Sequence, residues 1–595
     1  MRLRFLHLLS LILMLAVAAP VMAQDNPPTL PEPPKEKLWD WDENDPRIGL
    51  HAGLHDAGEA SKGVTLLANM PKPAGFRDAL RTGGSVSNTD LAFHNGMAFV
   101  GNYRGFNIYD VSDPRNPELR TSVVCPGGQG DISVYGDLLF MSVQETRGRL
   151  DCGTQGVEAP VSAERFRGVR IFNISNIDSP TQVAAVQTCR GSHTHTVVSD
   201  PNDAENVYVY VQGTSRVRPA AELAGCSAAQ DPDEDPNTSY FRIEVIKVPL
   251  AAPALAEIVN MPRIFEADGS LGGLWQGGDH GPGTQASRRT NQCHDITAFP
   301  AVGLAAGACA GNGILLDITD PANPVRIEQV VDPNFAYWHS ATFNNDGTTV
   351  IFTDEWGGGG QARCTSEDPQ TWGANAIFDL VDGHLKLRGY YKLPVPQTDK
   401  ENCVAHNGSI IPVPGRDIKA QAWYQGGMSI FDFTDPENAF EIGFFDRGPV
   451  SDTMLVSGGY WSTYWHNGQL FGAEIARGFD IFELEPSEHL SANEIEAAKL
   501  VSMRDFNAQE QPLIEWPAVS VVARAYMDQL VRANAISGDW VSRVNKALDM
   551  NQGDELVAAA YTLEMAALGS LASGQSRNED KIRVRLAKVL REMSE

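Results

Sequence analysis

Short apolar runs rich in β-branched residues recur along the middle of the chain, and polar turn residues separate them. Four related stretches mark this recurrence: residues 110–117, 173–180, 317–324 and 432–438. Each carries Asp or Asn, then Ser or Thr two residues later, then Pro within the next few positions. Asp, Asn and Pro favour turns, and Pro cannot donate to a sheet ladder, so each stretch predicts the turn between two strands.

Four apolar runs form one cycle around such a turn. The first cycle has runs at residues 90–93, 97–101, 105–110 and 118–124, and the Asn-Gly at residues 95–96 predicts a tight hairpin. Similar cycles begin near residues 131, 195, 294, 339, 406 and 460, and the last one ends one strand short. A lone apolar run at residues 64–68, followed by Pro, has the pattern of the missing fourth strand.

This repetition predicts a mainly β fold, a seven-bladed β-propeller closed by an N-terminal strand. Closure of the ring joins the two ends of the repeat region and leaves only short edges. Loops rich in Gly and Pro interrupt the cycle at residues 146–167, 214–239, 266–291 and 356–373. Long loops on a rigid scaffold often carry function, so we expect these insertions to crowd one face of the ring.

The repeat itself resembles a known family. The resemblance lies in Gly105-Phe-Asn-Ile-Tyr-Asp-Val-Ser-Asp-Pro, Gly313-Ile-Leu-Leu-Asp-Ile-Thr-Asp-Pro and Gly427-Met-Ser-Ile-Phe-Asp-Phe-Thr-Asp-Pro. These segments are similar to the LVIVD-repeat family of exported bacterial β-propellers, over roughly residues 64–484. The third, fifth and seventh units depart from the pattern because they lack the Asp-Pro turn. The resemblance implies fold and export, but it implies no activity, since this family shares no catalytic motif.

Residues 1–23 have the features of a cleavable signal peptide. Arg2 and Arg4 precede an apolar stretch at residues 8–19, and small residues favour cleavage after Ala23. No other apolar run in the sequence reaches the length of a bilayer span, so we expect no membrane insertion after cleavage. We therefore expect a periplasmic or secreted protein.

Three further regions follow the signal peptide. Residues 24–60 read as an irregular leader, residues 61–486 as the propeller, and residues 487–595 as a C-terminal α-helical domain. The sequence Ser491-Ala-Asn-Glu494 is a capping box, and apolar residues at helical spacing from about residue 512 predict a bundle of three or four helices. The formal net charge of −28 argues against nucleic acid as a partner.

Eight cysteines, an even number, favour disulfides in an exported chain. One set precedes the first strand of a cycle and the other follows a second strand, which places both sets at one edge of the ring. This placement predicts the pairs Cys125–Cys152, Cys189–Cys226, Cys293–Cys309 and Cys364–Cys403. Connectivity cannot be proven from sequence, so the pairing is a hypothesis.

Histidines give the most informative chemical pattern. Five of them lie at or near the start of a first strand in four successive cycles: His193, His195, His294, His339 and His406. First strands line the channel of a propeller, so these imidazoles are candidate ligands of one transition metal ion such as Fe, Cu or Zn. The alternative is that they are ordinary polar residues of a channel mouth.

Acidic residues at the ends of second strands extend this picture. Glu145, Asp354, Glu355 and Glu474 are candidate bases or hard-metal ligands if they face the channel, or a solvated rim if they do not. His94 and His466 lie in His-Asn-Gly turns and are better explained as turn residues.

Two classes of function remain open. One is an exported binding or scaffold protein that presents its loop-rich face to a protein or an extracellular ligand. The other is a metalloenzyme, for example an oxidoreductase, with a multi-histidine site at the mouth of the channel. The first class is favoured for two reasons: the repeat family is defined by its fold, and no acid–base set is visible in the sequence.

Overall fold

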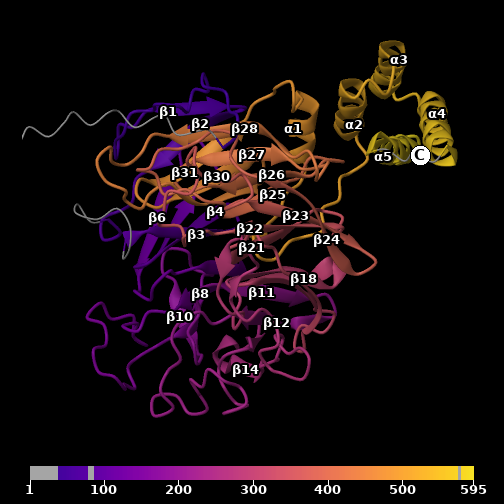
Figure 1. Cartoon of the computed structure of the whole chain (residues 1–595). Coiled ribbons are helices and arrows are strands. Elements are labelled where there is room, and N and C mark those ends of the chain that lie inside the picture. Colours follow the sequence, from indigo (N-terminus) through magenta and orange to yellow (C-terminus); the bar gives the residue numbers. More distant parts are fainter. Residues whose placement is uncertain (1–37, 78–85, 574–577) are drawn as a thin grey trace, which may run out of the picture. The chain divides into compact units, whose positions relative to one another are not determined.

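The computed structural model describes residues 38–77, 86–573 and 578–595, and these form a mainly β body followed by helices (Figure 1). Most strands fall into antiparallel groups of four that follow chain order. The groups in the first half are β3 (Asn88–His94), β4 (Met97–Asn102), β5 (Gly105–Asp110), β6 (Glu118–Val124); β7 (Ile132–Tyr135), β8 (Leu138–Val143), β9 (Gly168–Asn173), β10 (Thr181–Gln187); β11 (His195–Asp200), β12 (Asp203–Val211), β13 (Glu244–Pro249), β14 (Glu257–Asn260).

The second half continues the same arrangement. Its groups are β17 (Asp295–Phe299), β18 (Leu304–Cys309), β19 (Asn312–Asp317), β20 (Val325–Val330); β21 (Trp338–Phe343), β22 (Thr349–Asp354), β23 (Asn375–Val381), β24 (His384–Tyr391); β25 (Asn407–Ile411), β26 (Ile418–Ala422), β27 (Met428–Asp432), β28 (Phe440–Arg447); and β29 (Tyr460–His466), β30 (Gln469–Glu474), β31 (Gly478–Leu484) with β2 (Val64–Met70). A short hairpin of β15 (Gly278–Asp279) and β16 (Ala286–Ser287) lies in the insertion at residues 266–291.

The first strands of the groups form a closed ring. Strand β3 contacts β7, and the contacts continue through β11, β17, β21, β25 and β29, which contacts β3 again. Strands β25 and β29 pair in parallel, as neighbouring first strands around a channel should. Strand β2 pairs antiparallel with β31, so the predicted closure of the last group by residues 64–68 is confirmed. The result is a β-propeller-like ring of small sheets.

The repeated turn motif has a local physical cause. In three copies the first Asp accepts a hydrogen bond from the backbone two residues on, as in Thr319 N–H to Asp317 Oδ1 at 2.9 Å. The second Asp does the same, as in Ala322 N–H to Asp320 Oδ1 at 3.0 Å. Two successive Asx turns reverse the chain with their donors satisfied, which explains why Asp and Pro recur in this order.

A segment that follows β31 closes one end of the channel. We call residues 505–516 the closing segment; it begins with β32 (Asp505–Asn507), which pairs with β3. It then contacts the far ends of further first strands, for example through Asn507 to both backbone groups of Val134 (2.7 and 2.8 Å) and through Gln511 to both backbone groups of Phe343 (2.6 and 3.0 Å). The channel therefore has one open end, where the first strands begin.

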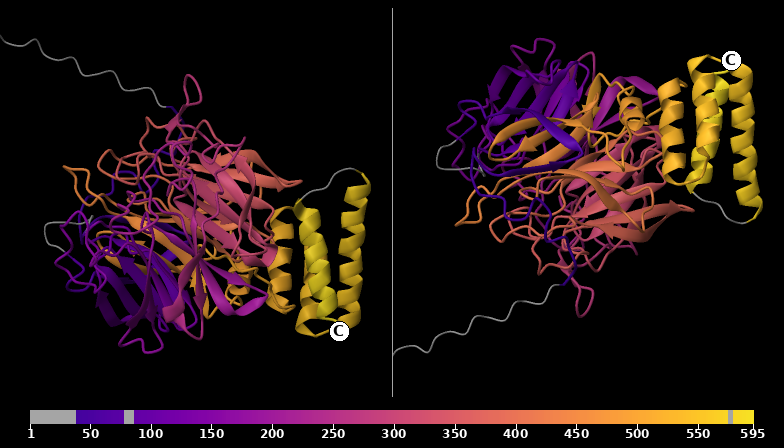
Figure 2. Two further views of the ribbon diagram at one scale, coloured as in Figure 1. Left: turned by 90° about the horizontal axis from the view of Figure 1, so that it is seen from below. Right: turned by 90° about the horizontal axis from the view of Figure 1, so that it is seen from above.

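The remaining elements are helices. Helix α1 (Ala492–Ala498) has the predicted capping box at Ser491, and its Ile495 and Ala498 share a core with Val64 of the ring. Helices α2 (Ser520–Arg532), α3 (Gly538–Asp549), α4 (Gly553–Ala572) and α5 (Asn578–Glu592) have a core of their own and run alongside one another in both views of Figure 2. Helix α1 also packs against α2, and its Ala497 belongs to the core of the four later helices, so α1 links the sheets to those helices.

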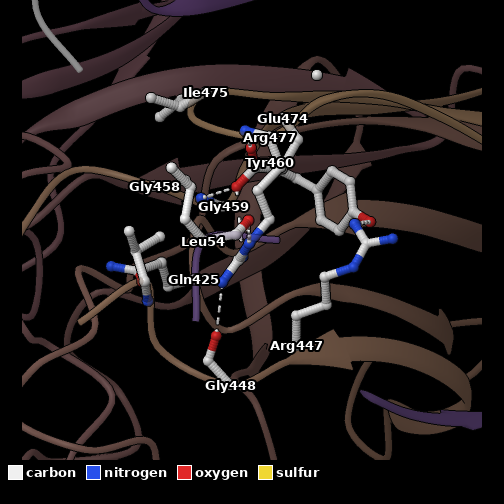
Figure 3. Close-up of polar contacts among 12 residues, drawn as sticks. Leu54, Gln425, Arg447, Gly448, Gly458, Gly459, Tyr460, Glu474, Ile475 and Arg477 are labelled. Carbon is white, nitrogen blue, oxygen red and sulfur yellow. Dashed lines mark hydrogen bonds and ion pairs between the residues drawn. The ribbon is translucent and has the colours of Figure 1, made fainter. Parts of the chain in front are cut away.

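The leader is irregular up to residue 58, and β1 (Glu59–Lys62) then adds to β28. Arg477 fixes this leader to the ring, because its guanidinium donates to the carbonyls of Gly53 at 2.8 Å and Leu54 at 3.2 Å. Its bond to the carbonyl of Gly448, at 2.8 Å, is drawn in Figure 3. Glu474 supports the same corner by accepting from Gly459 N–H at 2.6 Å. The predicted signal peptide and residues 24–37 of the predicted leader lie outside the described residues.

All four predicted disulfides are present. Sulfur atoms are 2.07, 2.06, 2.02 and 2.01 Å apart in Cys125–Cys152, Cys189–Cys226, Cys293–Cys309 and Cys364–Cys403. Cys293–Cys309 closes the β17–β18 hairpin, and each of the other three bonds ties an insertion to the ring. Four disulfides are typical of proteins in an oxidising compartment outside the cytoplasm.

Candidate metal centre

A cavity of about 870 Å³ lies at the open end of the channel, where the first strands begin. Its floor carries imidazoles from the channel, and its walls include parts of two insertions. Its lining residues include His193, His294, His406, Glu355, Tyr424, Tyr103 and the glycines at 357–360.

Four histidines form a continuous series at this end of the channel; His193, His294 and His406 line the cavity, and His339 is fully buried. His193 precedes β11, His294 and His406 stand immediately before β17 and β25, and His339 is in β21. Their ring centroids are 4.5 Å apart for His193–His294, 3.8 Å for His294–His339 and 4.3 Å for His339–His406. The Nε2 atoms of His193 and His294 are 2.8 Å apart. The strands thus bring together four of the five histidines that the sequence singles out.

A carboxylate faces the same series. Glu355 follows β22, and its Oε2 is 3.7 Å from His339 Nε2 while its Oε1 is 3.8 Å from His406 Nε2. Tyr424 Oη donates to Glu355 Oε1 at 2.7 Å. This hydrogen bond leaves Oε2 directed at His339.

The backbone around this pair is specialised. Tyr424 lies in a tight turn after β26 with φ of +53°, a region that bulky residues rarely adopt. Gly359 has φ of +68°, and a Cβ at this position would overlap Tyr424 Oη and lie 2.7 Å from Glu355 Oε1. Only glycine therefore fits where the insertion passes over the Tyr–Glu contact.

Three of these side chains bring candidate ligand atoms close together. One atom each from His294, His339 and Glu355 lies within 4.8 Å of the others, and all three residues are buried. Among the described residues, both ring nitrogens of His339, Nδ1 of His294 and Nε2 of His406 have no hydrogen-bond partner. Buried polar atoms are nearly always paired, so free imidazole lone pairs around a carboxylate fit a metal ion.

Burial sets the charge state of these groups. It lowers the pKa of His193 to about 4 and of His406 to about 3, and it also holds the pKa of His294 and His339 well below the ordinary value. The imidazoles are therefore neutral at pH 7, the form that binds metals. Burial also raises the pKa of Glu355 to about 7, against the hydrogen bond from Tyr424, which lowers it.

His195 does not join the other four histidines. Its Nδ1 lies 2.8 Å from Ser142 Oγ on β8 and 3.2 Å from Asp131 Oδ2. The backbone bends at His193, so the two residues do not share a face as alternate positions of one straight strand would. His94 and His466 end β3 and β29 beside their Asn-Gly turns, as predicted.

Three of the four acids at the ends of second strands, Asp354, Glu355 and Glu474, are buried, whereas Glu145 is half-buried. Glu355 faces the histidines, and Asp354 accepts from the backbone of Ala336, Tyr337 and Gly373 and from Gln285 Nε2, at 2.7 to 3.0 Å. Asp354 thus fixes the ends of two insertions around the cavity. Sequence reasoning missed Tyr424; the only signal was a tyrosine in a Trp-Tyr-Gln-Gly-Gly turn.

No family model matches the chain, and no curated protein matches it. Among solved structures, the chain is similar to a periplasmic gluconolactonase from Pseudomonas aeruginosa at 12% identity and TM-score 0.38, over 67% of this chain and 96% of that one. It is similar to a putative 6-phosphogluconolactonase from Bacteroides uniformis at 11% identity and TM-score 0.37, over 65% and 89%. It is also similar to hydrazine synthase from Kuenenia stuttgartiensis at 10% identity and TM-score 0.41, over 68% and 96%. At these values the likeness carries no information on function.

Proposed function

We propose that this protein is an exported metalloprotein, with one transition metal ion held by His294, His339 and Glu355 at the mouth of a seven-bladed propeller. The observation that carries the proposal is the set of three buried ligand-type atoms within 4.8 Å of one another, with imidazole nitrogens that lack hydrogen-bond partners among the described residues. His193 and His406 are the candidates for further ligands, because each adjoins one member of the set.

Two imidazoles and one carboxylate form a ligand set that suits non-haem Fe(II) or Zn(II). Copper fits the same imidazoles but gains less from a carboxylate. Metal–nitrogen bonds of about 2.0–2.1 Å place adjacent ligand atoms roughly 3 Å apart, so small rotations of these side chains suffice. Such an ion, when bound, supplies a Lewis acid or a redox centre, which makes an enzyme the favoured class.

The side chains around the centre have separate roles. Tyr424 orients Glu355 by a hydrogen bond. The histidines are neutral, so their nitrogen lone pairs are available to bind a metal cation. The closing segment hydrogen-bonds strand ends at the opposite end of the channel, and the cavity offers a small molecule a route to the centre. The cavity wall carries Tyr103, Tyr337 and Trp461, which offer aromatic surfaces to an organic substrate.

Metal analysis of the purified protein tests this proposal. We expect one equivalent of metal after purification from an exported compartment, and its loss from a His294→Ala/His339→Ala variant. The exposed His384 supplies the control, because His384→Ala should keep the metal. A wild-type protein that neither retains nor takes up Zn(II), Fe(II) or Cu(II) in stoichiometric amount refutes the proposal.

A second candidate is the binding or scaffold class. Its support is the loop-rich rim: Asp354 fixes insertions 266–291 and 356–373 beside the cavity, and disulfides fix others. A protein or extracellular ligand that binds equally well to the metal-free histidine variant would favour this class over the enzyme.

Export and family membership complete the proposal. A signal peptide cleaved after Ala23 would deliver the chain to the periplasm or the medium, where its four disulfides form. N-terminal sequencing of the mature protein should begin at Gln24. The repeated Asp-Pro turn motif supports membership of the LVIVD-repeat family, which the repeat resembles in sequence.

A further inference from the structure

The wall of the cavity above the candidate metal centre carries one charged cation, Arg288. Among the described residues that line the cavity it is the only lysine or arginine, and the histidines there are neutral because burial lowers their pKa. Glu355 is the only carboxylate of that lining, and it is turned toward the histidines. Arg288 is exposed and forms no ion pair with a described residue. A free guanidinium in a cavity wall is suited to bind an anion.

The backbone that carries Arg288 is held on both sides. Ser287 pairs with Gly278 in the hairpin of β15 and β16. Thr290 Oγ1 donates to Asn312 Oδ1 at 2.7 Å, at the start of β19. These contacts fix the base of the Arg288 side chain before any ligand arrives. Binding therefore requires little further ordering of the chain.

Aromatic rings stand at both ends of the histidine series. The ring centroid of Tyr337 is 5.8 Å from that of His294, and the ring centroid of Trp461 is 5.0 Å from that of His406. Both Tyr337 and Trp461 line the cavity. A flat organic ring in the cavity thus finds aromatic surfaces beside the candidate metal ligands.

The charge of Arg288 acts on the same wall as Tyr337. Burial raises the pKa of Tyr337, and the charge of Glu355 adds to this effect. Arg288 and Arg190 both act in the opposite direction and lower that pKa. Arg190 is occupied, because its guanidinium donates to the carbonyl of Asn291 at 3.1 Å. This wall is therefore locally positive although the chain has a net charge of −28, since distant charges are screened beyond about 8 Å at physiological ionic strength.

Two polar side chains of the lining lack a partner. Ser287 is 8% exposed and Gln129 is 2% exposed, and both residues line the cavity. Oγ of Ser287 and Oε1 of Gln129 have no hydrogen-bond partner among the described residues. Buried polar atoms are nearly always paired, so these two favour a ligand that carries polar atoms of its own.

We propose that the cavity binds an aromatic carboxylate, and that Arg288 recognises the carboxylate group. The inference rests on the proposed function, since it names the substrate class of the same site. A planar guanidinium donates two parallel N–H bonds to a carboxylate, while Tyr337 and Trp461 offer their rings to the aromatic part. Phosphate fits less well, because a dianion would meet a single free guanidinium among the described residues of the wall. The cavity of about 870 Å³ has room for a ligand of this size.

Calorimetric titration of the full mature protein with benzoate tests the proposal, after a chelator has removed any metal. We expect saturable binding in the wild type, binding about 10- to 100-fold weaker in Arg288→Gln, and an intermediate affinity in Arg288→Lys. Arg115→Gln is the matched control, because Arg115 is exposed in the turn between β5 and β6, and it should bind benzoate like the wild type. Benzamide has the same shape without the charge, so Arg288→Gln should change its affinity by less than about threefold.

Three results would overturn the proposal: a wild type that binds no benzoate, an Arg288→Gln variant that binds it as tightly as the wild type, or inorganic phosphate that binds more tightly than benzoate. Failure of the metal centre has a different signature. Because the titration uses metal-free protein, benzoate binding that depends on Arg288 in a chain that takes up no metal would refute only the metal centre. A chain that takes up metal, but binds benzoate equally well with Arg288→Gln, would refute only the carboxylate site.

Discussion

The contact between Tyr424 and Glu355 allows a sharp test of the metal centre. Tyr424→Phe removes one hydroxyl, and the ring that remains still packs 4.4 Å from His406. The lost bond is 2.7 Å long, buried and made to a carboxylate, so its contribution is about 1.5–3 kcal/mol. Without it Glu355 is no longer held with Oε2 toward His339, and the metal must order the carboxylate itself. We expect metal binding to weaken by about 10- to 100-fold.

The assay is a competition titration of the metal-free protein with Zn(II) and a chelator of known affinity at fixed pH. Tyr103→Phe is the matched control, because Tyr103 lines the same cavity and has no hydrogen bond to Glu355. Its affinity should equal that of the wild type. The reasoning is wrong if Tyr424→Phe binds Zn(II) within about threefold of the wild type, or if Tyr103→Phe loses as much.

Three further predictions follow from the same structure. Gly359→Ala should weaken metal binding more than Tyr424→Phe does, because its Cβ would displace the tyrosine hydroxyl from Glu355; equal affinity in a titration would contradict this. Burial lowers the pKa of His466 to about 4 from its ordinary value near 6.5. Between pH 6.5 and pH 4 this histidine is protonated in the unfolded chain but not in the folded one, so the free energy of unfolding of the wild type should fall by about 3 kcal/mol over that range. Denaturant titrations should show that His466→Gln lacks this part of the pH dependence, and parallel curves would argue against it. Asn507→Leu should lower the free energy of unfolding by about 2–5 kcal/mol, since both backbone groups of Val134 lose their partner; an unchanged denaturation midpoint would refute it.

The strand groups could be predicted because their signal is local. Each copy of the Asp-Pro motif encodes two Asx turns, and the apolar runs on either side have the length of strands. The disulfides followed from the strands, because Cys364 follows the second strand of one unit and Cys403 precedes the first strand of the next, at the same edge of the ring. The repeating order of strands also placed His294, His339 and His406 at equivalent positions near the start of a first strand.

The rest depended on contacts that no local pattern records. Asn507 and Gln511 in the closing segment are polar residues without periodicity, and their role is to hydrogen-bond strand ends far away in the sequence. From the sequence, Glu355 could equally belong to a solvated rim. It is buried because an insertion folds over it, and no local pattern records that contact. His195 was misplaced because one bend in the backbone changed which way its side chain points.

Closure of the ring from both ends of the chain has a consequence for rates. Strand β2 must meet β31, and the closing segment must then reach the ends of strands from much earlier in the sequence. Contacts between residues so far apart form late, so folding should be slow. Equally, the first and last strand groups cannot separate from the ring without breaking one of these closures, so we expect unfolding to be slow as well. We therefore expect this protein to be kinetically stable, that is, to stay folded because the barrier to unfolding is high. Such stability is useful outside the cytoplasm, where no ATP-dependent chaperone can refold the chain.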